Sequence, residues 1–156
     1  VRSYFVEDSL FRRQVEEMEQ QNLTMQNFSD GRPSSIDNLH FFPPARGHVA
    51  SKFDLQNGQF GVSVEVNGGS VVMAALSGVI VAAHWTIENG YVVNIQHELN
   101  ITTVYKNNKR LFKQVGAHVN AGEAIAIAGA SKDDSTLLFE IWSNGVPVDP
   151  ELYIVF

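Results

Sequence analysis

The sequence predicts a mainly β, antiparallel domain preceded by an amphipathic helix, on three observations. From about residue 42 to the C-terminus, short apolar runs alternate with Gly and Asn turn signals. These runs stand too close together for crossover helices, so neighbouring strands are expected to be antiparallel. Before them, apolar residues recur at helical spacing in residues 1–24, and residues 25–41 are rich in linker-forming Ser, Asn, Asp, Gly and Pro.

The composition is that of one globular domain with its own core. The chain has 156 residues, of which 44% are hydrophobic and 18% charged. A formal net charge of -6, with no long run of Lys or Arg, argues against a nucleic-acid partner. The absence of Cys excludes disulfides and Cys-containing zinc sites, and no stretch approaches the ~20 apolar residues of a membrane span. Because the chain starts at Val1 without a signal-like segment, we expect a fragment or a processed form.

The expected helix at residues 1–24 has one apolar face, formed by Tyr4, Phe11, Val15 and Met18. Its other face is charged. Three arrangements fit this pattern: packing on its own domain, the end of a coiled coil that lets the chain self-associate, and an arm that binds a partner. The repeat is too short to choose among them.

Eight strands are expected in the β-rich part, separated by turns. Residues 88–90 and 107–108 are predicted hairpin turns because Asn and Gly favour the backbone of tight turns. Residues 79–83 and 124–128 are apolar on both faces, which predicts buried central strands. The expected strands span roughly residues 47–53, 59–66, 71–74, 78–84, 90–96, 101–106, 123–128 and 136–142.

Several segments of this β-rich part resemble the LytM-type (lysostaphin-like) zinc endopeptidases, in the family's order and spacing. One is the strand with Phe139-Glu140, which in the family begins with His-x-His. Six others lie at residues 47–53, 59–64, 72–80, 90–97, 115–125 and 144–150. The resemblance implies a LytM-type antiparallel sheet, or hybrid barrel, over residues 42–156.

The resemblance also implies where a zinc site would lie. The family binds zinc through the His and Asp of one motif and the second His of His-x-His, and two further histidines assist catalysis. Leucine has no lone pair for a metal, amides and hydroxyls are poor zinc ligands, and neither Thr nor Asn titrates near neutral pH. We therefore expect no metal, no cofactor and no hydrolytic activity. Gln59 and Ser63 stand at the positions of the first motif's His and Asp, and Leu138 stands at the second His of His-x-His. Thr136 and Asn107 stand at the positions of the two histidines that assist catalysis.

Degenerate relatives of this family regulate or scaffold cell-wall hydrolases or bind murein, so the resemblance implies an inactive domain of the bacterial cell envelope, in the periplasm. Anchoring by a segment upstream of this chain stays open. The expected partner is peptidoglycan, a muropeptide or a cell-wall hydrolase. Three alternatives stay open: an interaction module working through residues 1–24, an active peptidoglycan endopeptidase, and a biotinyl or lipoyl type carrier. The groove that would hold the partner is expected at Gln59, Ser63, Tyr105, Asn107, Thr136 and Leu138.

Overall fold

The computed structural model describes residues 35–67, 69–130 and 135–156, so the helix predicted at residues 1–24 lies outside the described residues. Within them, no helix is long and apolar enough to cross a membrane. Ten strands and four single-turn 3-10 helices make up the described part. They are η1 Ile36–Asn38, β1 His48–Ser51, η2 Leu55–Asn57, β2 Val62–Glu65, β3 Val71–Met73, β4 Gly78–Thr86, β5 Gly90–Gln96, η3 Glu98–Asn100, β6 Ile101–Leu111, β7 His118–Val119, β8 Ala124–Ala128, β9 Thr136–Ser143, β10 Val146–Val148 and η4 Pro150–Leu152.

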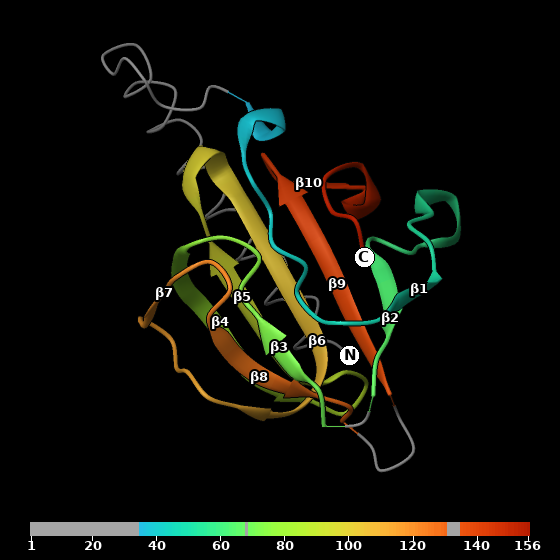
Figure 1. The fold of residues 1–156 in the computed structure, drawn as a ribbon, viewed down its shortest axis with the longest axis vertical. Helices are drawn as coiled ribbons and strands as arrows, with labels where there is room; N and C mark the ends of the chain where they lie inside the picture. The colour runs from blue at the N-terminus through green and yellow to red at the C-terminus, as the bar shows by residue number, and fades with distance from the viewer. Residues whose placement is uncertain (1–34, 68, 131–134) are drawn as a thin grey trace.

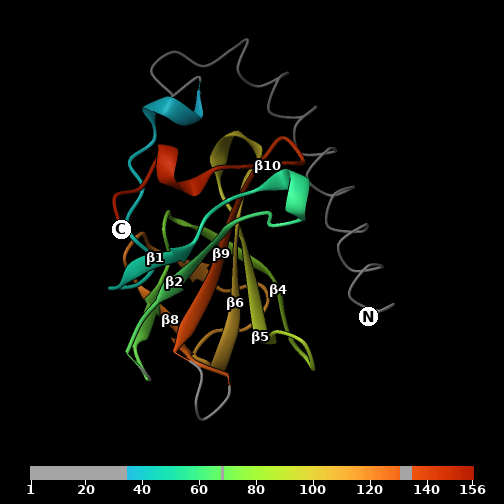
Figure 2. The ribbon, with the colours of Figure 1, turned by 90° about the vertical axis from the view of Figure 1, so that its right-hand side faces the viewer.

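The main sheet runs in the order β1-β2-β9-β6-β5-β4-β7, and β10 adds to β9. Every pair in it is antiparallel. Figure 2 shows its strands fanned side by side from β1 to β4. The predicted fold class is therefore confirmed, because short connections leave the chain no way to make parallel neighbours.

Strand β6 bends out of the main sheet and starts a second layer. The hairpin turn predicted at residues 107–108 is wrong: Asn107 has a φ of 75°, yet the strand continues to Leu111. A single left-handed Asn inserts a bulge, which bends a strand rather than reversing it. Beyond the bend β6 pairs with β8, which pairs with β3. Figure 1 shows β3 and β8 in front of the main sheet.

The hydrophobic core lies between these two layers. Leu137, Phe139 and Ile141 alternate along β9 and are fully buried, as expected when one face of a strand meets a core. The residues just before β1 help to close the core. Phe41, which lies in the predicted linker, is buried, and its ring packs 5.7 Å from that of Tyr153.

Strand β4 is not the buried central strand that its apolar run predicts. In residues 79–83 only Ile80 is buried. On one side β4 pairs with β5 along its length, and on the other it pairs with β7 only at Gly78 and Val79. A short apolar run has the same composition in the middle and at the border of a sheet, so sequence does not distinguish the two.

Candidate functional site

Three neighbouring strands bring most of the predicted site residues together. Ser63 on β2 pairs with Leu138 on β9, which pairs on its other side with Lys106 on β6. Paired residues have Cβ atoms about 5 Å apart and point to the same side of a sheet. Because Leu137 and Phe139 point into the core, this row points away from it. We name this side the vestigial face; it is formed by Gln59, Ser63, Lys106, Asn107, Thr136 and Leu138.

A nearly buried ion pair lies on the vestigial face. The Lys106 ammonium lies 3.0 Å from Glu140 Oε2, and the two side chains are only 9% and 11% exposed. The other carboxylate oxygen, Oε1, accepts a hydrogen bond of 2.8 Å from Trp142 Nε1. Trp142 in turn packs against Phe60, with ring centroids 5.9 Å apart. Both oxygens of this carboxylate therefore have partners, which a carboxylate so removed from water requires.

Gln59 enters the vestigial face from a short loop. Its backbone forms an isolated bridge with Asp54, and its side-chain Oε1 accepts a 2.7 Å hydrogen bond from Ser51 Oγ. Two residues on, Gly61 lies directly against β9: a Cβ there would collide with the Phe139 carbonyl and the Glu140 side chain. Glycine at this position therefore allows the start of β2 to approach β9.

Asn107 and Thr136 meet at the other end of the vestigial face. The bulge in β6 turns the Asn107 side chain towards β9, where its Nδ2 donates a 2.6 Å hydrogen bond to the Thr136 carbonyl. The amide is mostly buried and ties β6 to the start of β9. Neither side chain titrates near neutral pH, so this pair positions strands and transfers no proton.

Tyr105 is the one predicted groove residue that the structure places elsewhere, and that prediction is corrected. Its side chain is fully buried in the core, on the opposite side of β6 from Lys106. Its hydroxyl accepts a hydrogen bond of 2.9 Å from the Ala75 amide and lies 2.7 Å from Thr103 Oγ1. Burial raises the pKa of this phenol. Tyr105 therefore stabilises the core and is out of reach of any groove ligand.

His97 continues the hydrogen-bond chain that begins at Tyr105. Its Nδ1 lies 2.8 Å from the Ser77 carbonyl, and its Nε2 lies 2.7 Å from Thr103 Oγ1. A carbonyl only accepts, so Nδ1 carries the proton and Nε2 accepts from the Thr103 hydroxyl. Burial lowers the pKa of His97 to about 4, although the bond to Ser77 opposes this shift. The imidazole is therefore neutral at physiological pH and belongs to the core.

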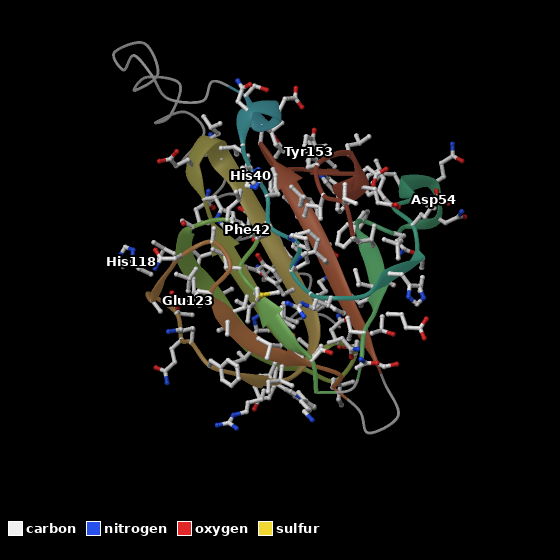
Figure 3. All side chains as sticks on the ribbon, viewed as in Figure 1. His40, Phe42, Asp54, His118, Glu123 and Tyr153 are labelled. Atoms are coloured by element: carbon white, nitrogen blue, oxygen red, sulfur yellow. The ribbon has the colours of Figure 1, made fainter. Side chains whose placement is uncertain are left out.

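The donor set of the vestigial face does not fit zinc. A hydrolytic zinc site needs three protein ligands, normally imidazole, carboxylate or thiolate, and an open position for water. Within residues 35–67, 69–130 and 135–156, no group of three or more His, Cys, Asp or Glu could hold a metal. Figure 3 shows Asp54 on the opposite side of the molecule from His118 and Glu123. The Lys106 ammonium, in the same row as Ser63 and Leu138, would in addition repel a cation.

Sequence reasoning missed the centre of this face, which is the network of Lys106, Glu140 and Trp142. One signal was available. Glu140 and Trp142 lie two and four residues after Leu138 on β9, so their side chains point to the same face as that of Leu138. The pairing of β6 with β9, which brings Lys106 to them, carries no signal in the local sequence.

Known proteins of similar sequence or fold include peptidases and a murein hydrolase activator. The chain matches the family described as Peptidase family M23 over residues 57–150. It is 29% identical over 119 residues to the murein hydrolase activator EnvC of Escherichia coli K12, an alignment that covers 72% of this chain and 28% of that protein. The chain thus spans well under a third of the length of that relative.

Several solved structures share the fold. Csd3 of Helicobacter pylori superposes with a TM-score of 0.67 at 22% identity, covering 76% of this chain and 34% of that one. A chain of the SpoIIQ–SpoIIIAH pore-forming complex superposes with a TM-score of 0.64 at 22% identity, covering 77% and 92%. At this level of identity the superpositions establish the fold and leave function to the site.

Proposed function

The chain belongs to peptidase family M23, and because its vestigial face holds a Lys106–Glu140 ion pair in place of a zinc site, we propose that it is a non-catalytic domain of the bacterial cell envelope. It works by binding: it regulates or scaffolds murein hydrolases. The observation that carries this proposal is the ion pair, together with the replaced ligands Gln59, Ser63 and Leu138. These residues can hold a partner by contact and hydrogen bonds, but they cannot activate water.

The similarity to a named murein hydrolase activator supports this role. The fold neighbour that is part of the SpoIIQ–SpoIIIAH complex supports a protein as the partner. A location in the periplasm fits the similarity to a murein hydrolase activator, since peptidoglycan and its hydrolases are found there. Direct binding of peptidoglycan or a muropeptide is the second form of the proposal. The half-exposed Ser63 and Thr136 favour it, because their hydroxyls could bond a glycan or a peptide amide.

The partner is expected to contact the vestigial face around Leu138 and Phe60. Leu138 is only half buried, and Phe60 is exposed and packs on Trp142, which forms a small hydrophobic cluster with Val92 and Val104. An apolar surface next to a satisfied ion pair offers contact area without an unpaired charge to desolvate. This combination suits the apolar side chains of a protein partner.

The proposal is tested by release of dye from labelled murein sacculi. The purified chain alone should release none, with or without added zinc, and should increase release by purified murein hydrolases of the source organism. Sedimentation with unlabelled sacculi tests the second form. Zinc-dependent release by the chain alone would overturn the non-catalytic assignment.

Two variants of matched chemistry locate the contact. Leu138→Glu should abolish stimulation, since it places a carboxylate in the apolar surface while the neighbouring Lys106 ammonium limits the cost to folding. Val155→Glu makes a similar change at a side chain that is 92% exposed and outside the face, and it should stimulate like the parent chain. Equal loss in both variants would contradict the placement of the partner on the vestigial face.

A further inference from the structure

A groove lies at the point where β6 leaves the main sheet. Strand β6 pairs with β5 as far as Asn108, and with β8 from Asn108 to Leu111. The chain returns to the main sheet at Gly116, whose amide donates a 2.8 Å hydrogen bond to the Ile80 carbonyl on β4. Between these two points, residues 109–115 form one wall of a groove of about 590 Å³. Backbone pairing fixes both ends of this wall, so the groove is part of the fold.

The groove has an apolar lining. Ala83 on β4 and Tyr91 on β5 contribute to it from the main sheet, and Phe112 and Val115 contribute from the opposite wall. Phe112 and Val115 are 41% and 60% exposed, so much of this apolar surface meets solvent. Tyr91 lies two residues before the core residue Val93 on β5, so the groove is on the side of the main sheet away from the vestigial face. Exposed apolar surface in a recess is typical of a binding site.

The groove is positively charged, although the chain as a whole is acidic. Lys109, Arg110 and Lys113 line it, in a chain whose formal net charge is -6. Lys113 is paired with Glu123 at 3.0 Å. Lys109 and Arg110 are exposed, and no carboxylate of the described residues pairs with either. The Arg110 guanidinium lies 5.6 Å from the centre of the Phe112 ring, so a cation stands at the edge of the apolar lining, where a carboxylate of a ligand would meet complementary charge.

The shape of the groove restricts the form of its ligand. A recess is entered from one direction, so a ligand must carry its apolar and acidic side chains on one side of its backbone. The side chains of an extended strand alternate between two sides, which does not meet this requirement. On a helix, residues i, i+4 and i+7 form one apolar face, and residue i+3 lies beside that face. A helix is also convex and can enter a recess, whereas a flat bilayer surface would span it.

We propose that this groove is a second binding surface, which takes an acidic amphipathic helix of a partner protein. The apolar face of the helix contacts Tyr91, Phe112 and Val115, and glutamates or aspartates beside that face lie next to Lys109 and Arg110. The surface lies on the other side of the main sheet from the vestigial face, so it does not depend on the function proposed for that face.

The test uses a fluorescent helical peptide of about four turns, with leucines at i, i+4, i+7 and i+11 and glutamates beside them at i+3 and i+10. The control peptide has the same composition, but its glutamates stand at i+2 and i+9, on the opposite face. Fluorescence anisotropy should show roughly tenfold tighter binding of the first peptide. Chemical-shift changes in NMR spectra should centre on Tyr91 and residues 109–115 and leave β2 and β9 unchanged. Failure of the first peptide to bind, equal affinities of the two peptides, or shifts on β2 and β9 alone would overturn the proposal.

Matched variants of the chain test the role of the two cations. Lys109→Glu with Arg110→Glu should weaken binding of the first peptide roughly tenfold, because two attractive contacts become repulsive. Arg46→Glu with Lys52→Glu makes an equal change of charge at exposed residues outside the groove and should leave the affinity unchanged. Equal weakening by both double variants would show that only the net charge of the chain matters, and would refute the proposed surface.

Two further measurements distinguish a partner helix from other occupants of the groove. The chain should not float with vesicles of phosphatidylglycerol, and its sedimentation should match that of the Lys109→Glu, Arg110→Glu variant. Flotation that this double variant abolishes would assign the groove to a membrane surface. Self-association that it abolishes would assign the groove to a second copy of the chain. Either result would contradict the proposal.

Discussion

Acidification is expected to destabilise the domain through His97, whose imidazole is buried between Ser77 and Thr103. Burial lowers its pKa from 6.5 to about 4 in the folded chain, while in the unfolded chain it titrates near 6.5. Between these values the unfolded state binds a proton that the folded state does not. Stability therefore falls as the pH falls through this window. Above pH 6.5 both states are neutral at His97, and below pH 4 both are protonated.

The magnitude follows from the difference between the two pKa values. Each pKa unit corresponds to about 1.4 kcal/mol, so the shift of His97 from 6.5 to about 4 is worth about 3 kcal/mol by pH 4. At pH 5.5, one unit below the unfolded pKa, the expected loss is about 1.4 kcal/mol. Against a total stability of about 5–15 kcal/mol for a domain, this loss is large.

The assay is urea unfolding of the chain and of His97→Gln at pH 7, pH 5.5 and pH 4.5. The variant is expected to be less stable at pH 7, because it loses part of the hydrogen-bond chain, but to lose less on acidification. Carboxylates titrate in both proteins, so the difference between the two pH curves isolates His97. Parallel curves would refute the reasoning, as would an NMR titration in which the imidazole of the folded chain protonates near pH 6.5.

Three further outcomes are expected from the vestigial face and its support. Lys106→Met and Glu140→Gln should each lower the free energy of unfolding, measured with urea, by about 3–5 kcal/mol, and the double variant should lower it much less. Losses that add up in the double variant would show that the two groups do not interact. Restoring the family's three zinc ligands at positions 59, 63 and 138 should give weak zinc affinity in a chelator competition. Adding Lys106→Ala to that variant should strengthen the affinity, because the ammonium repels the ion. Equal zinc affinities with and without Lys106→Ala would contradict that role. Gly61→Ala should cost about 1–3 kcal/mol through collision with the Phe139 carbonyl, against little change for the neighbouring Ser63→Ala; a stable Gly61→Ala chain would mean that β2 can move away from β9.

Much of the fold was predictable because its signals are local. Alternating apolar residues and the Asn-Gly turn signals located eight of the ten strands of the described residues to within a few positions. The two missed strands, β7 and β10, have two and three residues, which are too few to show an alternation of apolar and polar side chains. At Asn107 the same local reasoning failed. Left-handed Asn suits both a turn and a bulge, and the pairing of β6 with β8 decided for the bulge.

The sequence by itself determined that the family's zinc ligands are replaced, because each ligand belongs to a short motif that can be compared position by position. It also determined the mainly β class. Only the tertiary structure decided that Tyr105 faces the core, that Lys106 reaches Glu140, and that β4 lies between β5 and the two-residue strand β7. These three facts depend on which strands become neighbours and in which register. That choice is made by the burial of residues far apart in the chain, so no local pattern carries it.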